Sequence, residues 1–152
     1  MKLGLMTAAL PDRSLEEVAA WASGNGFESL EICAWPTGDA ERRYAGVTHV
    51  DVVDFDKAKA QHVLDLMDHY QLGISSLAYY PNPLHPDPQH RQAVIGHLKK
   101  VIVAAELLGV EIVGTFVGRD KHKTLEENWG AFEQVWPPIV KFAADHGVKI
   151  AI

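Results

Sequence analysis

Two long segments of the sequence gather the side chains best suited to bind a ligand or to move a proton. The first, residues 34 to 55, contains an indole, two guanidinium groups, a phenol and an imidazole, from Trp35, Arg42, Arg43, Tyr44 and His49. The second, residues 81 to 88, places three polar side chains among four prolines: Asn82, His85 and Asp87. Proline restricts the backbone, so the second segment is expected to be ordered before any ligand binds. Loops of this length are functional or disordered more often than they are simple connectors.

A charged side chain also interrupts an apolar segment at Glu31. In Leu30-Glu31-Ile32-Cys33, strand alternation turns the two aliphatic residues toward the helices and Glu31 with Cys33 to the other face. A carboxylate there has to be paired, hydrogen-bonded or neutral, so a structural partner is favoured over a catalytic role. Lys149 is a candidate partner by the same alternation in a later strand. Cys33 is interpreted as a small buried filler rather than a nucleophile, because the sequence fixes no base beside it.

Four glycines indicate how these segments are positioned, because each follows a helical pattern and precedes an apolar run of strand length. The strands predicted in this way are residues 27 to 33, 74 to 80, 110 to 117 and 148 to 152, after Gly26, Gly73, Gly109 and Gly147. Glycine just beyond a helix end adopts the left-handed backbone that other residues resist. A further strand is predicted over Lys2 to Met6. Strands that alternate with helices favour a parallel sheet, so the predicted fold class is α/β.

The helical segments carry apolar side chains at the spacing of one helix face. Four helices are predicted from the stripes that begin at Leu15, Ala60, Val94 and Trp129. Capping boxes, in which each side chain satisfies the other residue's free backbone N–H, are predicted for Ser14 with Glu17 and for Thr124 with Glu127. Pro137 and Pro138 lie inside the last helix, where a missing N–H and a ring clash cost about 3 kcal/mol or more. A kink or a break is therefore expected there.

The composition limits the class of protein and its partners. The chain has 152 residues, of which 47% are apolar and 22% charged, as is typical of one globular domain or a piece of one. Its 14 basic and 20 acidic residues give a net charge of -6 without a basic stripe, which argues against a nucleic-acid partner. No apolar run approaches the roughly 20 residues of a spanning helix, so no membrane partner is expected. A single cysteine favours a reducing compartment, the cytoplasm.

The predicted order of elements places both long segments at one edge of the sheet. In parallel sheets, ligands bind at the carboxyl ends of the strands, and both segments follow strands there. The chain ends on the apolar strand 148 to 152, as an interrupted domain does. An eight-fold barrel needs about 250 residues, so the chain is expected to supply a little over half of one. The histidines in or beside predicted helices are mostly expected at the surface: His62, His69, His97, His122 and His146.

Three stretches of the sequence resemble a known family. They are residues 34 to 49 (AWPTGDAERRYAGVTH), 77 to 86 (LAYYPNPLHP) and 113 to 120 (VGTFVGRD). They are similar to the sugar phosphate isomerase/epimerase branch of the xylose isomerase-like TIM barrels, and the resemblance runs along the whole chain in order. It implies an incomplete parallel (β/α) barrel of about five strands and four helices, in which residues 1–152 are the N-terminal part of a single domain. Glu31 then faces the barrel lumen.

The resemblance also implies a reaction and a metal. In this family a proton moves next to a carbonyl through an enediolate held on a divalent metal, with a carboxylate as general base. The metal is Mn, Mg, Zn or Co, and its ligands come from strands 5 to 8, beginning with a Glu at the end of strand 5. These ligands are therefore expected beyond Ile152. The segment alone is expected to be inactive and to supply the wall that binds a sugar or sugar phosphate.

Four side chains are expected, by the same resemblance, to line that wall. Trp35 provides an apolar platform for a sugar face, and Tyr80 and His85 are hydroxyl partners. Arg119 is a clamp for a phosphate or carboxylate. Tyr79 and Tyr80 lie on opposite strand faces, and Tyr80 is preferred because it is nearer the strand end. Structural alternatives stay open: Trp35 as a cap on the barrel mouth, and Arg119 as part of a surface charge cluster with the two residues that follow it.

Three functions remain open on the sequence alone. The leading one is the N-terminal part of a metal-dependent sugar isomerase or epimerase, and a second is a non-catalytic sugar-binding or interaction module. The third, a metal-dependent endonuclease of the same superfamily, is disfavoured because the strand ends read Tyr79-Tyr80 and Thr115-Phe116 where such relatives carry metal-binding histidines. The outer strands should expose unpaired edges, so the segment is expected to self-associate or to pair with a missing C-terminal half.

Overall fold

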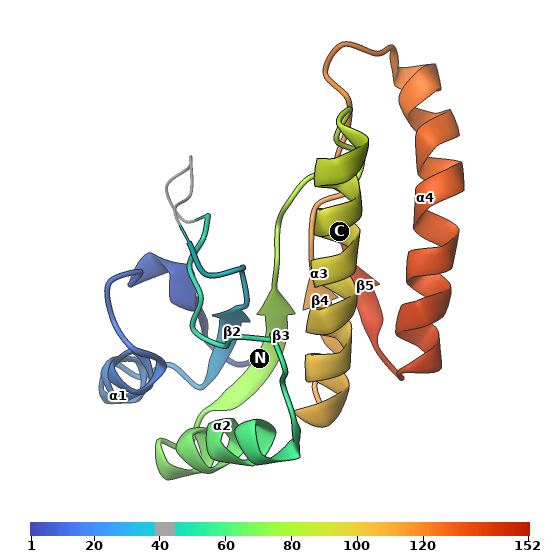
Figure 1. Cartoon of the computed structure of the whole chain (residues 1–152). Helices are drawn as coiled ribbons and strands as arrows, with labels where there is room; N and C mark the ends of the chain where they lie inside the picture. The colour runs from blue at the N-terminus through green and yellow to red at the C-terminus, as the bar shows by residue number, and fades with distance from the viewer. Residues whose placement is uncertain (39–44) are drawn as a thin grey trace.

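The computed structural model describes residues 1–38 and 45–152 and shows a parallel β/α fold (Figure 1). One sheet of five parallel strands follows the order of the sequence, β1-β2-β3-β4-β5. The strands are β1 (Gly4–Met6), β2 (Ser29–Cys33), β3 (Gly73–Ala78), β4 (Ile112–Gly114) and β5 (Lys149–Ala151). A doubly wound sheet would reverse its strand order at one point, whereas a barrel does not. The predicted partial-barrel fold is therefore confirmed.

Helices alternate with the strands along the chain (Figure 1). They are α1 (Leu15–Gly24), α2 (Lys57–His69), α3 (Pro88–Leu107) and α4 (Leu125–Asp145), and a short 3-10 helix, η1 (Thr7–Ala9), follows β1. Both predicted capping boxes are present, at Ser14 with Glu17 and at Thr124 with Glu127. Within the described ranges, no helix has the length and apolar character needed to cross a membrane. The loop residues Arg42, Arg43 and Tyr44 of the sequence analysis lie outside the described residues.

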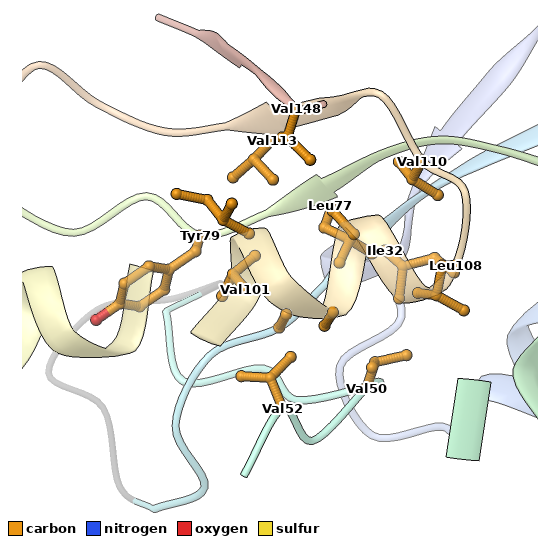
Figure 2. Packing of buried hydrophobic residues seen from close by; sticks show 14 of the residues in the cluster. Ile32, Val50, Val52, Leu77, Tyr79, Val101, Leu108, Val110, Val113 and Val148 are labelled. Carbon is orange, nitrogen blue, oxygen red and sulfur yellow. The ribbon is translucent and has the colours of Figure 1, made fainter. Parts of the chain in front are cut away.

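The main hydrophobic core lies between the sheet and the helices (Figure 2). Leu30 and Ile32 of β2, Leu77 of β3 and Val113 of β4 are fully buried there. The helices contribute fully buried side chains to the same core, namely Leu98, Val101, Ile102, Trp136 and Ile139. A second, smaller group, which we call the lumen cluster, consists of Ala8, Cys33, Val47 and Ala78. Because Cys33 and Ala78 alternate with Ile32 and Leu77, the lumen cluster lies on the face of the sheet that turns away from the helices.

Three of the four predicted helix-ending glycines have the left-handed backbone. Gly26, Gly109 and Gly147 have φ angles of 80°, 66° and 69°. The prediction is wrong at Gly73, which is the first residue of β3, while Gln71 adopts the left-handed conformation with φ of 55°. The turn after α2 therefore begins two residues earlier than the glycine pattern indicates. Glycine is favoured at such positions because it has no Cβ, but other residues can also occupy them.

Of the kink or break expected at Pro137 and Pro138, the break does not occur. The helix α4 continues through both residues from Leu125 to Asp145. The two prolines lie on the exposed side of the helix, as do Glu133 and Gln134 one turn earlier. Carbonyl groups that lose their helical donors on this side can bond to water instead. The buried side of the helix, which includes Trp136 and Ile139, keeps its packing against the core. Tertiary packing thus outweighs the local cost of proline.

Candidate functional site

The carboxyl ends of β2 and β3 bring an acid and a phenol together on the lumen face. The Tyr80 hydroxyl donates a hydrogen bond of 2.6 Å to Oε1 of Glu31. A bond this short between a hydroxyl and a carboxylate is charge-assisted and stronger than a neutral one. The structure therefore gives Glu31 a partner, but not the predicted one. Lys149 lies at the far strand, where its Nζ is 3.2 Å from Glu111 and both side chains are exposed.

A bulge in β3 places Tyr80 on the lumen face. Leu30 of β2 aligns with Ile74, but the next residue, Glu31, aligns with Ser76, so Ser75 is skipped in the register. The skipped residue is held by its own hydroxyl, which donates to the carbonyl of Leu30 at 3.0 Å. Ile74 and Leu77, three residues apart, consequently both pack in the helix-side core. The extra residue changes the alternation, so that Tyr79 faces the helices and Tyr80 faces the lumen.

The phenol of Tyr80 holds its proton firmly. Burial raises its pKa above the ordinary value of 10.0, and the hydrogen bond to Glu31 and the negative charge of that carboxylate raise it further. The Tyr80 ring also packs against the lumen cluster and lies 4.9 Å, centre to centre, from the ring of Phe116. Phe116 is 54% exposed, so one wall of this position is an accessible aromatic surface. Tyr80 is therefore a neutral, oriented hydroxyl at the rim of the lumen.

Gly114, at the end of β4, provides the space that the pair occupies. A Cβ at this position would collide with the Tyr80 hydroxyl and would lie 3.1 Å from Oε1 of Glu31. Three adjacent strands thus form this position. The carboxylate lies on β2, the phenol follows β3, and the glycine that leaves room for them lies on β4. The sequence pattern did not reveal this role of Gly114, because the glycine lies inside the strand predicted over residues 110 to 117, whereas β4 ends at this residue.

We predict that Gly114→Ala separates Tyr80 from Glu31. The added methyl group requires the phenol to move, because its atoms would otherwise overlap, while the backbone of β4 is held by pairing on both sides. The expected cost is about 1–3 kcal/mol of unfolding free energy, since a half-buried carboxylate loses its donor. Urea denaturation measures this loss. Gly96→Ala in α3, where an added Cβ meets no atom within 4 Å, is the control and should stabilise the protein. Equal effects of the two substitutions would contradict the prediction.

The thiol of Cys33 lies beside the pair but is not activated. Cys33 is fully buried, and burial is the main cause that raises the pKa of its thiol. Its backbone N–H donates to the hydroxyl of Thr7 at 2.9 Å, which ties the end of β2 to η1. A buried neutral thiol is a weak nucleophile and a weak metal ligand. Cys33 is therefore a packing residue of the lumen cluster, as the strand alternation predicts.

Trp35 forms the boundary between the lumen cluster and the helix-side core, against both of which it packs. Its ring lies edge-on to Tyr79 at 5.1 Å between centroids. The hairpin that returns from the long loop fixes its backbone, since the hydroxyl of Thr48 donates to the Trp35 carbonyl at 2.7 Å. An isolated antiparallel bridge joins Ala34 to Thr48 next to this bond. Packing therefore holds the indole at the strand ends, and the contacts with Thr48 hold its backbone.

A buried histidine that was expected at the surface supports Trp35. His97 of α3 is 8% exposed, and its Nε2 lies 2.8 Å from the carbonyl oxygen of Ala34. Its ring lies 4.6 Å from that of Tyr79, whose burial raises its own pKa to about 12. The surface prediction for His97 is wrong because the helix pattern does not show which polar side chain reaches a loop carbonyl. His62, His69 and His122 are exposed as predicted.

We predict that the protein loses stability as the pH falls below about 6.5 because of two histidines. Burial lowers the pKa of both His97 and His49 below the ordinary value of 6.5. The unfolded chain therefore binds protons that the folded chain does not, so stability is complete above pH 6.5 and declines below it. Unfolding free energies from urea titrations at pH 7.5 and pH 5.5 measure the decline. His97→Gln should reduce it by roughly half, since His49 still contributes. The exposed control His62→Gln should leave it unchanged, and a decline unaffected by His97→Gln would contradict this assignment.

The loop after β4 is joined to the loop after β3 by the side chain of Asn82. Its Oδ1 accepts the backbone N–H of Arg119 at 2.9 Å and that of Leu84 at 3.1 Å, while its Nδ2 donates to the Arg119 carbonyl at 2.8 Å. Arg119 is exposed, and among the described residues no ion pair includes its guanidinium. Its backbone is therefore fixed, and its side chain is exposed. The sequence analysis named Asn82 as a loop residue but did not identify this clamp.

His85 is positioned at the beginning of α3 and not beside the Glu31–Tyr80 pair. Its Nδ1 accepts the backbone N–H of Asp87 at 3.2 Å, and its ring lies 4.2 Å from that of His90. Arg91 donates to the His85 carbonyl at 3.0 Å. In the part of the chain that the structure describes, no hydrogen bond joins His85 to Tyr80, Glu31 or Arg119. The structure thus joins Glu31 to Tyr80, packs Trp35 against the same lumen cluster as Tyr80, and leaves His85 and Arg119 on the surrounding loops.

The side chains at the strand ends do not fit a divalent metal site. Such ions require several carboxylate or imidazole ligands that converge on one point. Over residues 1–38 and 45–152, no three side chains of His, Cys, Asp or Glu come close enough together to hold a metal. Glu31 supplies the carboxylate of the pair, and one of its oxygens already accepts a hydrogen bond from Tyr80. The arrangement can instead bind hydroxyl groups at Glu31 and Tyr80, an apolar ring face at Trp35 and an anion at Arg119.

The chain matches a protein family and resembles solved structures. A family model described as "Xylose isomerase-like TIM barrel" matches residues 19–152. The fold is similar to that of D-psicose 3-epimerase from Clostridium cellulolyticum H10, solved with D-tagatose, with a TM-score of 0.72 and 17% identity. That match covers 99% of this chain and 51% of the other. No curated protein sequence matches the chain significantly.

Two further solved structures have the same fold. A sugar phosphate isomerase/epimerase from Parabacteroides distasonis ATCC 8503 matches with a TM-score of 0.67 and 16% identity, covering 98% of this chain and 49% of that one. The IOLI protein, described with a zinc atom, matches with a TM-score of 0.68 and 21% identity, covering 99% and 50%. The chain therefore spans about half the length of each of these structures. At such identities the likeness establishes the fold.

Proposed function

This chain belongs to the xylose isomerase-like TIM barrel family, and from that membership we propose that residues 1–152 form the N-terminal part of a cytoplasmic sugar or sugar phosphate isomerase or epimerase. The observation that carries the proposal is the wall at the strand ends. Glu31 and Tyr80 form a polar pair, and Tyr80 and Trp35 both pack against the lumen cluster, on the face of the sheet that turns away from α1 to α4. Ligands of parallel barrels bind at this end.

The chain's own residues bind and orient the substrate in this proposal. Trp35 offers an aromatic surface for the apolar face of a sugar, and Tyr80 with Glu31 offers oxygen partners for its hydroxyl groups. Arg119, on the loop that Asn82 clamps, is a partner for a phosphate or carboxylate group at the rim. The Nδ1 of His85 is engaged by the backbone N–H of Asp87, which leaves Nε2 of this ring for a substrate hydroxyl.

The reaction class is the movement of a proton on the carbon next to a carbonyl. A divalent metal is implied by the family resemblance, and one of the similar structures is described with a zinc atom. The described residues of this chain do not fit such an ion, so we assign its ligands to sequence beyond Ile152. The contribution of residues 1–152 is then to hold the sugar so that its reacting carbon faces the opposite wall.

Solvent hydrogen exchange tests the proposal. Protein expressed from the complete reading frame is incubated in D₂O with a panel of keto and aldo sugars and their phosphates, and deuterium in the sugar is measured by mass spectrometry. We expect incorporation next to the carbonyl of at least one sugar, and its loss when a chelator is added. Binding without exchange would identify a sugar-binding module instead. Neither binding nor exchange with any sugar would refute the proposal, and exchange indifferent to chelator would refute the metal.

Tyr80→Phe is the informative variant in this assay, and Tyr70→Phe is its control. Tyr80 meets Glu31 at the strand ends, whereas Tyr70 is the residue that caps α2 at the opposite end of the sheet. Loss of one hydrogen bond to a substrate hydroxyl is expected to reduce kcat/KM about fivefold to tenfold in Tyr80→Phe. Tyr70→Phe should retain the activity of the original protein.

We also propose that the outer strands pair with further polypeptide. β1 and β5 each have one neighbour in the described sheet, so each exposes backbone donors and acceptors. The partner is the C-terminal half of the barrel or, in its absence, another copy. Residues 1–152 expressed alone should therefore show a sedimentation coefficient that increases with concentration. A single monomeric species at all concentrations would contradict this prediction.

A further inference from the structure

The hydrogen bond between Tyr80 and Glu31 has a direction, and that direction determines what the wall can recognise. A tyrosine hydroxyl has one proton to donate and two lone pairs with which to accept. An ionised carboxylate can only accept. The bond of 2.6 Å therefore uses the single proton of Tyr80 and leaves only lone pairs on its oxygen for a ligand.

From this geometry we infer that Glu31 makes Tyr80 an obligate hydrogen-bond acceptor, so that the lumen wall selects a neutral ligand hydroxyl that donates to the Tyr80 oxygen and rejects an anionic group at the same position. This inference rests on the proposed function and deepens it. It assigns Glu31 as a positioning residue that acts through Tyr80. It also orients the substrate, with its polyhydroxyl portion in the lumen and any phosphate outside.

The surroundings of the pair keep the bond in this direction. Among the described residues, no lysine, arginine or histidine forms an ion pair with Glu31, so no cation competes for its oxygens. The Tyr80 ring is fixed between the lumen cluster and Phe116. The Tyr80 hydroxyl and Oε1 of Glu31 fill the space beside Gly114, so that another donor has no room on the β4 side. Burial and the adjacent carboxylate both raise the pKa of Tyr80, so the phenol keeps the proton that it shares.

The charge of the wall supports the exclusion of anions. Glu31 is a carboxylate on the lumen face, and Tyr80 presents a second acceptor beside it. A phosphate oxygen at this point would meet two acceptors and one like charge, which is unfavourable in a partly buried site. Arg119 lies instead on the loop after β4, where Asn82 holds its backbone. The neutral hydroxyl groups of a ligand would therefore bind at Tyr80, and an anionic group would bind at Arg119.

Deoxy and deoxyfluoro sugars distinguish a donating from an accepting hydroxyl. Replacement of a hydroxyl by hydrogen removes both functions, whereas replacement by fluorine removes the donor and keeps a weak acceptor. If a ligand hydroxyl donates to Tyr80, the two replacements at that carbon weaken binding equally. If the hydroxyl accepts from Tyr80, the fluorinated analogue binds more tightly than the deoxy analogue. The ratio of their dissociation constants therefore reports the direction of the bond.

The test is calorimetric titration of protein from the complete reading frame with D-fructose and D-xylose and with their monodeoxy and monodeoxyfluoro analogues. At one carbon, both replacements should weaken binding about fivefold to tenfold, with a ratio near one. In Tyr80→Phe, the deoxy penalty at that carbon should disappear. In Glu31→Ala, the released phenol can donate, so the fluorinated analogue should bind about twofold or more better than the deoxy analogue. Glu16→Ala, an exposed carboxylate of α1, should behave like the original protein.

A second readout does not depend on sugar binding. Ultraviolet absorbance detects ionisation of tyrosine, and Glu31→Ala should shift the Tyr80 component, identified by comparison with Tyr80→Phe, to lower pH. A merely structural role of Glu31 would change stability and this shift but not the analogue ratio.

The outcomes separate this inference from the proposed function. Absence of binding by both sugars, together with absence of exchange across the whole panel, overturns both. Sugar binding in which Tyr80→Phe and Glu31→Ala leave every analogue ratio unchanged overturns only the inference. A fluorinated analogue that binds better than its deoxy counterpart in the original protein at the carbon sensitive to Tyr80→Phe also overturns it. Tighter binding of D-fructose 6-phosphate than of D-fructose that is lost in Tyr80→Phe would place the phosphate at the wall and overturn it as well.

Discussion

Trp136→Ala is expected to lower the unfolding free energy by about 3–5 kcal/mol, the largest effect of any substitution considered. Trp136 is 1% exposed and is the largest fully buried side chain in the described residues. Its removal leaves a cavity between α4 and the sheet and also removes a donor, since the indole N–H bonds to the Val117 carbonyl at 3.1 Å. Domains of this size are stable by about 5–15 kcal/mol, so the variant should approach the limit of folding.

Urea denaturation followed by circular dichroism measures this loss, and the same helix provides the control. Trp129 lies two turns earlier in α4 and is 55% exposed. Trp129→Ala should cost less than about 1 kcal/mol, because little apolar area is buried there. Trp136→Phe keeps most of the volume and isolates the contribution of the bond to Val117. Equal losses for Trp136→Ala and Trp129→Ala would show that α4 does not pack as the structure places it.

Gly118→Ala is expected to have the second largest effect, about 2–4 kcal/mol of unfolding free energy. Gly118 has a φ of 77°, which is costly for any residue with a Cβ. The added carbon would also overlap Oδ1 of Asn82 and lie 2.9 Å from Cδ of Pro83. The clamp that joins the loops after β3 and β4 would open, and its hydrogen bonds to Arg119 would be lost.

Thermal and urea unfolding measure the loss of unfolding free energy, and anion binding measures the effect on Arg119. If Arg119 binds the phosphate of a substrate, Gly118→Ala should weaken a sugar phosphate more than the corresponding neutral sugar. Gly130→Ala is the matched control, because Gly130 lies in α4 and an added Cβ meets no atom within 4 Å. That substitution should stabilise the protein by about 1 kcal/mol. If Gly118→Ala changed neither stability nor anion binding, the proposed role of the Asn82 clamp would be contradicted.

The sequence predicts the fold well because the signals of the fold are local and repeated. Apolar stripes, capping boxes and glycine turns recur in each β/α unit, and their order leaves a parallel sheet as the expected result. The departures occur where packing overrides local propensity. Pro137 and Pro138 are tolerated on the exposed side of α4, and Gln71 replaces a glycine in the turn before β3.

The site is less predictable than the fold because it depends on register and on distance across strands. Alternation correctly turns Glu31 to the lumen face, but it assigned Lys149 as the partner, which the structure places at Glu111. The bulge at Ser75 changes which face of β3 carries Tyr80, and no local sequence signal marks it. The clamp at Asn82 is of the same kind, since it joins residues 37 positions apart. Side-chain contacts between distant segments cannot be read from the spacing of residues alone.

The residues of the proposed site position one another. The bulge in β3 aims Tyr80, Gly114 makes room for it, and Glu31 fixes the direction of its proton. His97 and Thr48 hold the backbone on either side of Trp35. These contacts come from three consecutive β/α units, those of β2, β3 and β4, so the wall exists only when the sheet is assembled.

A crystal structure of the protein from the complete reading frame, bound to a sugar that it exchanges in D₂O, tests the central claim most directly. We expect a sugar at the carboxyl ends of the strands, with one hydroxyl within hydrogen-bond distance of the Tyr80 oxygen and an apolar face against Trp35. A sugar bound at the amino ends of the strands, or at the carboxyl ends without contact to Tyr80, would contradict it.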